Sequence, residues 1–90
     1  MKSYLIALKL NLPETSYTNL INYLKTAPQW AHPFESTWIV QTEIDLGPIR
    51  DGVMGRVNKN DSVLVVEIVG KRWATNNVTI AVTDWMHKNL

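Results

Sequence analysis

The sequence predicts an α+β sandwich, in which helices pack on one face of a β-sheet. Three strongly apolar segments alternate with period two, as strands do: residues 4–10, 36–42 and 62–69. Segments with helical periodicity lie between them, so that two β-α-β units surround a hairpin. This βαββαβ order is the split β-α-β, or ferredoxin-like, pattern, here with an added C-terminal helix. We expect one ferredoxin-like domain over residues 1–90.

Composition limits the classes of protein that fit this chain. Ninety residues with 46% hydrophobic side chains are typical of one small folded domain. The net charge of +1 means that any binding to nucleic acid needs a local basic patch. The absence of cysteine excludes disulfides, thiolate nucleophiles and cysteine-ligated zinc. With no apolar run near 18 residues, we expect a cytoplasmic protein without a membrane partner.

The first half of the chain predicts a strand, a helix and a hairpin. Residues 4–10 are apolar on both faces until Lys9, which indicates a strand covered on both sides. Thr15 or Ser16 is a suitable N-cap for a helix over residues 16–26, which Pro28 ends. The helix has one apolar stripe, formed by Tyr17, Leu20, Ile21 and Leu24. Residues 29–34 alternate and should form a hairpin with the strand over residues 36–42.

The second half predicts a helix, a central strand and a final helix. Residues 45–57 have a helical stripe, although Gly52 and Gly55 each cost about 1 kcal/mol relative to alanine. Residues 62–69 are the most hydrophobic strand and should be central. Asn76 or Asn77 should cap the last helix. The inner face of that helix is apolar and comprises Val78, Ala81, Val82, Trp85 and Met86.

One face of the predicted sheet lacks a covering layer, because right-handed crossovers place both main helices on the other face. The residues expected on the bare face are Leu5, Ala7, Val63, Val65 and Val69. Either the C-terminal helix or a second subunit must cover them, and we expect a homodimer. Glu67 interrupts the apolar strand and is expected to be buried at a dimer interface, paired with Lys9 on a neighbouring strand.

Several short segments, in this order and spacing, carry a resemblance to a known family. They are Leu-Asn-Leu-Pro at 10–13, Glu-Ser-Thr-Trp-Ile-Val-Gln-Thr at 35–42, Ile-Arg-Asp at 49–51, Asp-Ser-Val-Leu-Val-Val at 61–66, and Gly70. Over residues 3–70 the chain resembles the Cas-two-like family, the small ferredoxin-like subunit of the CRISPR adaptation machinery. Within that family it is most similar to the short SinR-like branch.

The resemblance implies a homodimer that acts on or holds nucleic acid. Some members of the family cleave RNA or DNA with a divalent metal, whereas others hold duplex DNA between copies of a partner integrase. The metal-binding aspartate of the family stands at the end of the first strand, and Lys9 occupies that position here. Because an ammonium group cannot ligate magnesium, we expect a non-catalytic scaffold with no metal and no cofactor.

Five residues are candidates for contact with nucleic acid: Lys9, Arg50, Lys71, Arg72 and Trp73. Cations beside an aromatic ring suit backbone contact combined with base stacking. Each residue also has a structural interpretation. In this interpretation Lys9 is a lysine at a strand end whose ammonium reaches water. Residues 71–73 form a polar loop anchored by its tryptophan, and Arg50 belongs to a solvated face beside Asp51.

Two other functions stay open. A metal-dependent ribonuclease of the toxin or CRISPR-associated type would need other carboxylates, such as Asp45, Asp51 or Asp61. A protein-interaction module, with an unknown protein partner, would suit the near-neutral charge and the four tryptophans. His32 and Glu35 are the only acid–base pair that the pattern indicates, and no nucleophile is placed beside them.

Overall fold

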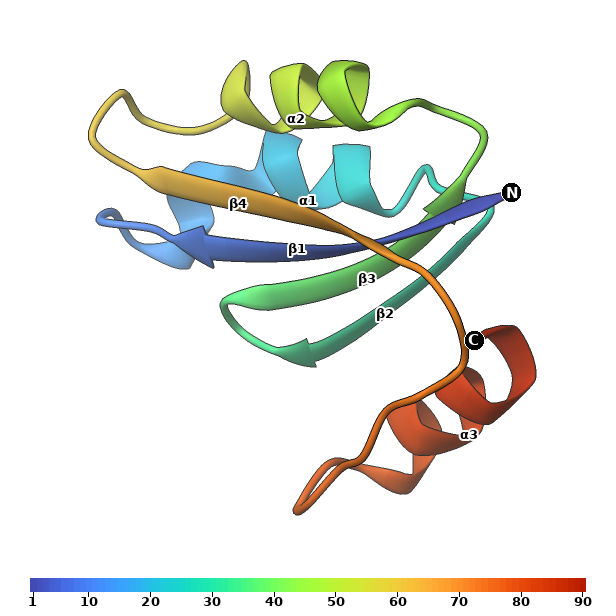
Figure 1. Ribbon diagram of the computed structural model, residues 1–90. Coiled ribbons are helices and arrows are strands. Elements are labelled where there is room, and N and C mark those ends of the chain that lie inside the picture. The colour runs from blue at the N-terminus through green and yellow to red at the C-terminus, as the bar shows by residue number, and fades with distance from the viewer.

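The computed structural model describes all 90 residues as a four-stranded sheet with helices on both sides (Figure 1). The elements in chain order are β1 (Lys2–Lys9), the 3-10 helix η1 (Glu14–Tyr17), α1 (Thr18–Leu24), β2 (Gln29–Phe34), β3 (Thr37–Thr42), α2 (Leu46–Met54), β4 (Ser62–Ile68) and α3 (Ile80–Asn89). The strands lie in the order β2-β3-β1-β4, and each neighbouring pair is antiparallel. The prediction that residues 62–69 form a central strand is wrong, because β4 pairs only with β1 and lies at an edge of the sheet. The predicted α+β class is confirmed, and the arrangement is compatible with a ferredoxin-like sandwich. No helix is both long and apolar enough to cross a bilayer.

The main core lies between the sheet and the layer formed by α1 and α2. Alternate residues of β1 and β3 point into it, as period-two alternation requires. The ten buried residues of this core are Tyr4, Ile6, Leu8, Tyr17, Leu20, Leu24, Trp38, Val40, Ile49 and Val53. The predicted apolar stripe of the first helix is confirmed, since Tyr17, Leu20 and Leu24 are buried in this core and Ile21 packs against it.

The starts of the helices differ from the prediction. Neither Thr15 nor Ser16 caps a helix, because the chain enters a 3-10 turn directly after Pro13. The last helix begins at Ile80, where Thr79 is the N-cap and its hydroxyl accepts a hydrogen bond from the Val82 amide. The prediction of Asn76 or Asn77 as the cap is wrong. Asn77 instead has a φ of 56°, a left-handed conformation that asparagine tolerates in turns.

The two main helices approach each other closely at Gly52. A Cβ atom at this position would lie 2.2 Å from the Tyr23 hydroxyl oxygen. The Arg56 guanidinium lies over the Tyr23 ring, 4.0 Å from its centroid, and donates a hydrogen bond to the Gly52 carbonyl. Gly52, which costs helix propensity, is thus the residue that lets Tyr23 and Arg56 stack between the helices.

The second face of the sheet carries a different set of β4 residues from the one predicted. Leu5 is paired with Val66 and Ala7 with Leu64, so these residues share the face opposite α1 and α2. Val63 and Val65, which were expected there, pack against the main core instead. The alternation itself was correct, but a strand apolar on both faces does not say which row meets the helices.

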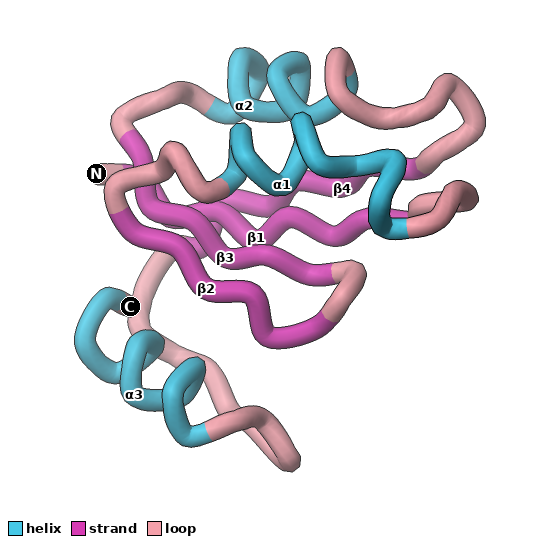
Figure 2. Tube along the Cα trace, turned by 180° about the vertical axis from the view of Figure 1, so that it is seen from behind, coloured by secondary structure: helices cyan, strands magenta, loops and turns pink.

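Helix α3 covers only the β2–β3 half of that second face. Figures 1 and 2 show α3 on the opposite side of the sheet from α1 and α2. Met86 packs against Ala31 and Ile39 in a second small core, and the Gln41 side chain donates a hydrogen bond to the Asn89 carbonyl. Along β1 and β4, Ile68 packs against this second core, whereas Leu64 and Val66 are exposed.

Candidate functional site

The five candidate residues for nucleic-acid contact do not converge within one chain. Lys9 is paired with Ser62 at one end of the sheet, whereas Ser3 is paired with Ile68 at the other. Lys71 follows Ile68 and therefore lies at the end away from Lys9. Arg50 lies on α2, where its guanidinium makes a salt bridge of 2.9 Å with the Asp51 carboxylate.

The segment after β4 exposes two free cations. Gly70 has a φ of +86°, which turns the chain out of the sheet directly before Lys71. Lys71 and Arg72 are exposed, and neither forms a salt bridge within the chain. Trp73 is half-buried, with its ring centroid 4.8 Å from that of His87 on α3. The tryptophan therefore anchors the loop against α3 and leaves the two cations in solvent.

Positive charge is unevenly distributed along the chain. Residues 70–90 contain three basic side chains (Lys71, Arg72 and Lys88) and one acidic side chain (Asp84). Residues 1–69 contain six basic and seven acidic side chains. The positive excess of the molecule therefore resides in the C-terminal segment, whose last helical turn carries His87 and Lys88.

The carboxylates considered for metal binding lie apart and are engaged elsewhere. Asp45 forms a salt bridge with Lys2, and the hydrogen bond from Lys2 lowers the pKa of that carboxyl below its usual value. Asp51 is paired with Arg50, and Asp61 accepts hydrogen bonds from Tyr17 and from two backbone amides. No group of three or more histidine or carboxylate side chains lies close enough together to hold a metal ion.

The expected pairing of Glu67 with Lys9 does not occur. Glu67 is paired with Tyr4, near the start of β1, and Lys9 is at the end of that strand. The two residues also project from opposite faces of the sheet. Glu67 shares the face of its partner Tyr4, and Lys9, five residues further along β1 than Tyr4, lies on the other face. Glu67 is exposed and does not need a partner.

His32 and Glu35 meet, but not as an acid–base pair. His32 Nε2 donates a hydrogen bond of 3.3 Å to the backbone carbonyl of Glu35, not to its carboxylate. The His32 ring stacks on Trp38 with a centroid separation of 3.8 Å. This geometry fixes the hairpin turn and leaves the Glu35 carboxylate free at the surface.

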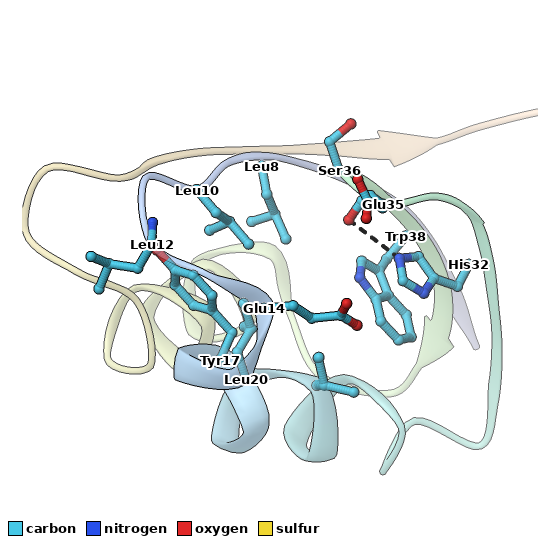
Figure 3. A pocket seen from close by; sticks show the side chains of 11 residues that line it. Leu8, Leu10, Leu12, Glu14, Tyr17, Leu20, His32, Glu35, Ser36 and Trp38 are labelled. Carbon is cyan, nitrogen blue, oxygen red and sulfur yellow. Dashed lines mark hydrogen bonds between the residues drawn. The ribbon is translucent and has the colours of Figure 1, made fainter.

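A pocket of about 220 Å³ lies beneath this histidine, between the end of β1, the η1–α1 segment and the β2–β3 turn. Figure 3 shows the side chains that line it. Its apolar lining comprises Leu8, Leu10, Leu12, Tyr17, Leu20, Ile21 and Trp38, and its polar lining comprises Glu14, His32, Glu35 and Ser36. We call it the Trp38 pocket. The sequence did not indicate it, because segments 8–21 and 32–38 meet only through the pairing of β1 with β3.

Comparisons with protein-family models, curated proteins and solved structures find no match for this chain. The resemblance to the Cas-two-like family therefore stays a prediction, carried by the segments quoted above.

Proposed function

We propose that this chain forms a homodimer through the β4 side of its sheet and acts as a non-catalytic scaffold that contacts a nucleic-acid backbone. In this proposal the domain is a ferredoxin-like sandwich to which α3 is an addition, as the Cas-two-like resemblance implies. The observation that carries the proposal is an open edge strand with exposed apolar residues. Leu64 is 59% exposed and Val66 46% exposed, in the middle of β4.

The two edges of the sheet differ in a way that favours pairing at β4. Edge strands that avoid pairing carry proline, lysine or a bulge, or are covered by another element. β2 has Pro33, an irregular register between Ala31 and Phe34, and contacts with α3. β4 has no proline, lysine or bulge, its single charged residue is Glu67, and five of its seven residues are apolar. A second β4 strand is the partner that such an edge accepts most readily.

An antiparallel pairing of two β4 strands would satisfy the open backbone edge of each copy and join the two sheets side by side. A twofold axis at Val65 sets Leu64 of one copy opposite Val66 of the other. The exposed rows of both copies then form one apolar strip, which Leu5 and Ala7 extend. The resulting sheet has eight strands, and its free edges are the protected β2 strands.

The same pairing would bring together cations that lie apart in one chain. With the axis at Val65, Ile68 of one copy lies opposite Ser62 of the other, and Ser62 is paired with Lys9 within its own chain. Lys71 and Arg72 follow Ile68, so they approach Lys9 of the second copy. The dimer would then carry two equivalent basic patches, and clustered cations of this kind suit phosphate contact.

Sedimentation equilibrium at about 1 and 50 μM tests the dimer, with the doubly substituted Leu64→Lys, Val66→Lys variant as the disrupted form. We expect a dimer for the parent chain and a folded monomer for the variant, because two lysines per copy would be brought face to face. Met54→Lys is the matched control, since Met54 is 54% exposed and belongs to α2, not to the β4 edge. A monomeric parent chain at 50 μM would disprove the β4 dimer.

Nucleic-acid binding is tested by gel shift with labelled duplex DNA and single-stranded RNA, at low salt, in magnesium and in manganese. We expect a shift without cleavage that weakens steeply as salt rises. Lys71→Gln with Arg72→Gln should weaken binding and flatten the salt dependence, whereas Lys25→Gln should not. Metal-dependent cleavage would contradict the non-catalytic role. No shift at all would favour the protein-interaction module.

A further inference from the structure

The Trp38 pocket combines an apolar interior with unpaired negative charge at its rim. Glu14 and Glu35 both line the pocket, and neither forms a salt bridge within the chain. Figure 3 shows the Glu14 side chain extending across the pocket toward Trp38 and His32. No lysine or arginine lines the pocket. The chain therefore supplies two carboxylates beside an apolar cavity and no cation to balance them.

We propose that the Trp38 pocket binds a primary alkylammonium group, with the alkyl chain in the pocket and the ammonium at Glu14 and Glu35. The charges decide the sign of the ligand, because an anion at this rim would meet two carboxylates. The seven apolar lining residues require a hydrocarbon stem, since burial of apolar surface supplies the main affinity. The volume suits one unbranched chain better than a drug-sized molecule, for which pockets are typically larger.

The aromatic residues of the pocket are held rigidly before a ligand arrives. Trp38 is only 2% exposed and is fixed by His32 stacked on one side and by Trp30, whose ring centroid is 5.5 Å away. Tyr17 is fixed through its hydroxyl by Asp61. A pocket whose walls are already ordered loses little conformational entropy on binding.

This inference is independent of the proposed dimer and of nucleic-acid binding. The pocket is lined by residues of β1, the η1–α1 segment, β2 and β3, together with the loops that join them, and by none from β4 or α3. A monomeric variant would therefore keep the pocket. Equally, a failure of ligand binding would not bear on the proposed pairing of β4 strands, because the β4 edge lies outside the pocket.

The test is an NMR titration of the ¹⁵N-labelled full chain with n-hexylammonium at pH 7, with 1-hexanol and hexanoate as uncharged and anionic counterparts. We expect saturable shifts of the Trp38 indole N–H and of the amides around the pocket, with a Kd of about 1 mM for so small a ligand. Hexanol should bind several-fold more weakly, and hexanoate should not saturate. Equal binding of amine and alcohol, or no shift at the pocket, would disprove the proposal.

Variants test the role of the carboxylates. Glu14→Gln and Glu35→Gln should each weaken hexylammonium binding about three- to fivefold, because exposed charge pairs contribute modestly, and should leave hexanol binding unchanged. Asp84→Asn removes a carboxylate on α3, outside the pocket, and should change neither.

A second ligand, Nα-acetyl-lysine amide, identifies the source of the ammonium. Binding comparable to hexylammonium indicates a lysine side chain of a partner protein, and binding of hexylammonium alone indicates a free amine.

Discussion

The Tyr17 hydroxyl donates a hydrogen bond of 2.7 Å to Oδ2 of Asp61, 44 residues further along the chain. The same carboxylate accepts hydrogen bonds from the backbone amides of Asn11 and Asn58, at 2.9 and 2.8 Å. Asp61 therefore joins the loop after β1 to the loop before β4 and fixes one wall of the Trp38 pocket. Asp61, which the sequence suggested as a metal ligand, instead accepts hydrogen bonds from both loops in the structure.

Asp61→Asn should lower the melting temperature measurably at pH 7, because it removes a charged acceptor shared by a buried tyrosine and two amides. Tyr17→Phe should lower it less, since Asp61 keeps both amide donors. Thermal unfolding followed by circular dichroism measures both changes, and Asp84→Asn is the control. Equal melting temperatures for Asp61→Asn and the control would contradict the role of Asp61 as a shared acceptor.

The contribution of Tyr17 and Asp61 to the free energy of unfolding should depend on pH in both the acid and the alkaline range. Burial raises the pKa of the Asp61 carboxyl, but the hydrogen bonds from Tyr17, Asn11 and Asn58 outweigh burial, so its pKa lies below the usual value. Stability from Asp61 is therefore present above about pH 4 and is lost as the pH falls through the lowered pKa. Burial, together with the bond to Asp61, raises the pKa of Tyr17, so its contribution is lost above about pH 10. Unfolding of Asp61→Asn across this range should lack the acid-side loss.

Gly52→Ala should destabilise the protein by about 1–3 kcal/mol, although alanine is the better helix former. The new Cβ would overlap the Tyr23 hydroxyl and force the ring away from Arg56. Gly47→Ala in the same helix is the control, because nothing lies within 4 Å of its Cβ position, and it should be neutral or slightly stabilising. Urea unfolding measures both. A stabilising Gly52→Ala would show that the two helices separate without cost.

Met86→Ala should loosen α3 without unfolding the main core. Met86 is the one buried residue of α3 and contacts Ala31 and Ile39 in the second small core. Its truncation should lower the free energy of undocking by about 2 kcal/mol and speed hydrogen exchange of α3 amides by at least tenfold. Amides of β1 should be unchanged, and Ile80→Ala, at an exposed position of the same helix, should have no effect. Equal acceleration of hydrogen exchange in β1 and α3 would show that α3 and the main core unfold as one cooperative unit.

Lys9→Asp introduces the aspartate that the resemblance to the Cas-two-like family implies at this position, yet it should not create magnesium-dependent cleavage. In the proposed β4 dimer the two copies of residue 9 lie at opposite ends of the interface. Within one chain, no cluster of three or more carboxylate or histidine side chains is present for it to join. The substitution should instead weaken duplex binding, because it reverses a charge in the basic patch. Cleavage that depends on metal in this variant would favour a dimer that brings the two positions together.

The candidate residues illustrate which parts of a site can be predicted from sequence. Lys71 and Arg72, the candidates in the loop after β4, are exposed in the structure, and their contact with nucleic acid stays a prediction. Trp73 was open between stacking on a base and anchoring a loop, and the structure places its ring against His87 on α3. The Trp38 pocket had no signal in the sequence, since its walls are far apart along the chain.

The sequence by itself determined the strands, the hairpin, the apolar stripes of the first two helices and the α+β class. Those features depend on local periodicity and on turn residues, which each segment carries within itself. Only the tertiary structure decided which row of β4 faces the helices, that Glu67 does not meet Lys9, and that α3 covers half of the second face. These outcomes depend on strand register, where a shift of one residue exchanges the two faces and no local pattern records the choice.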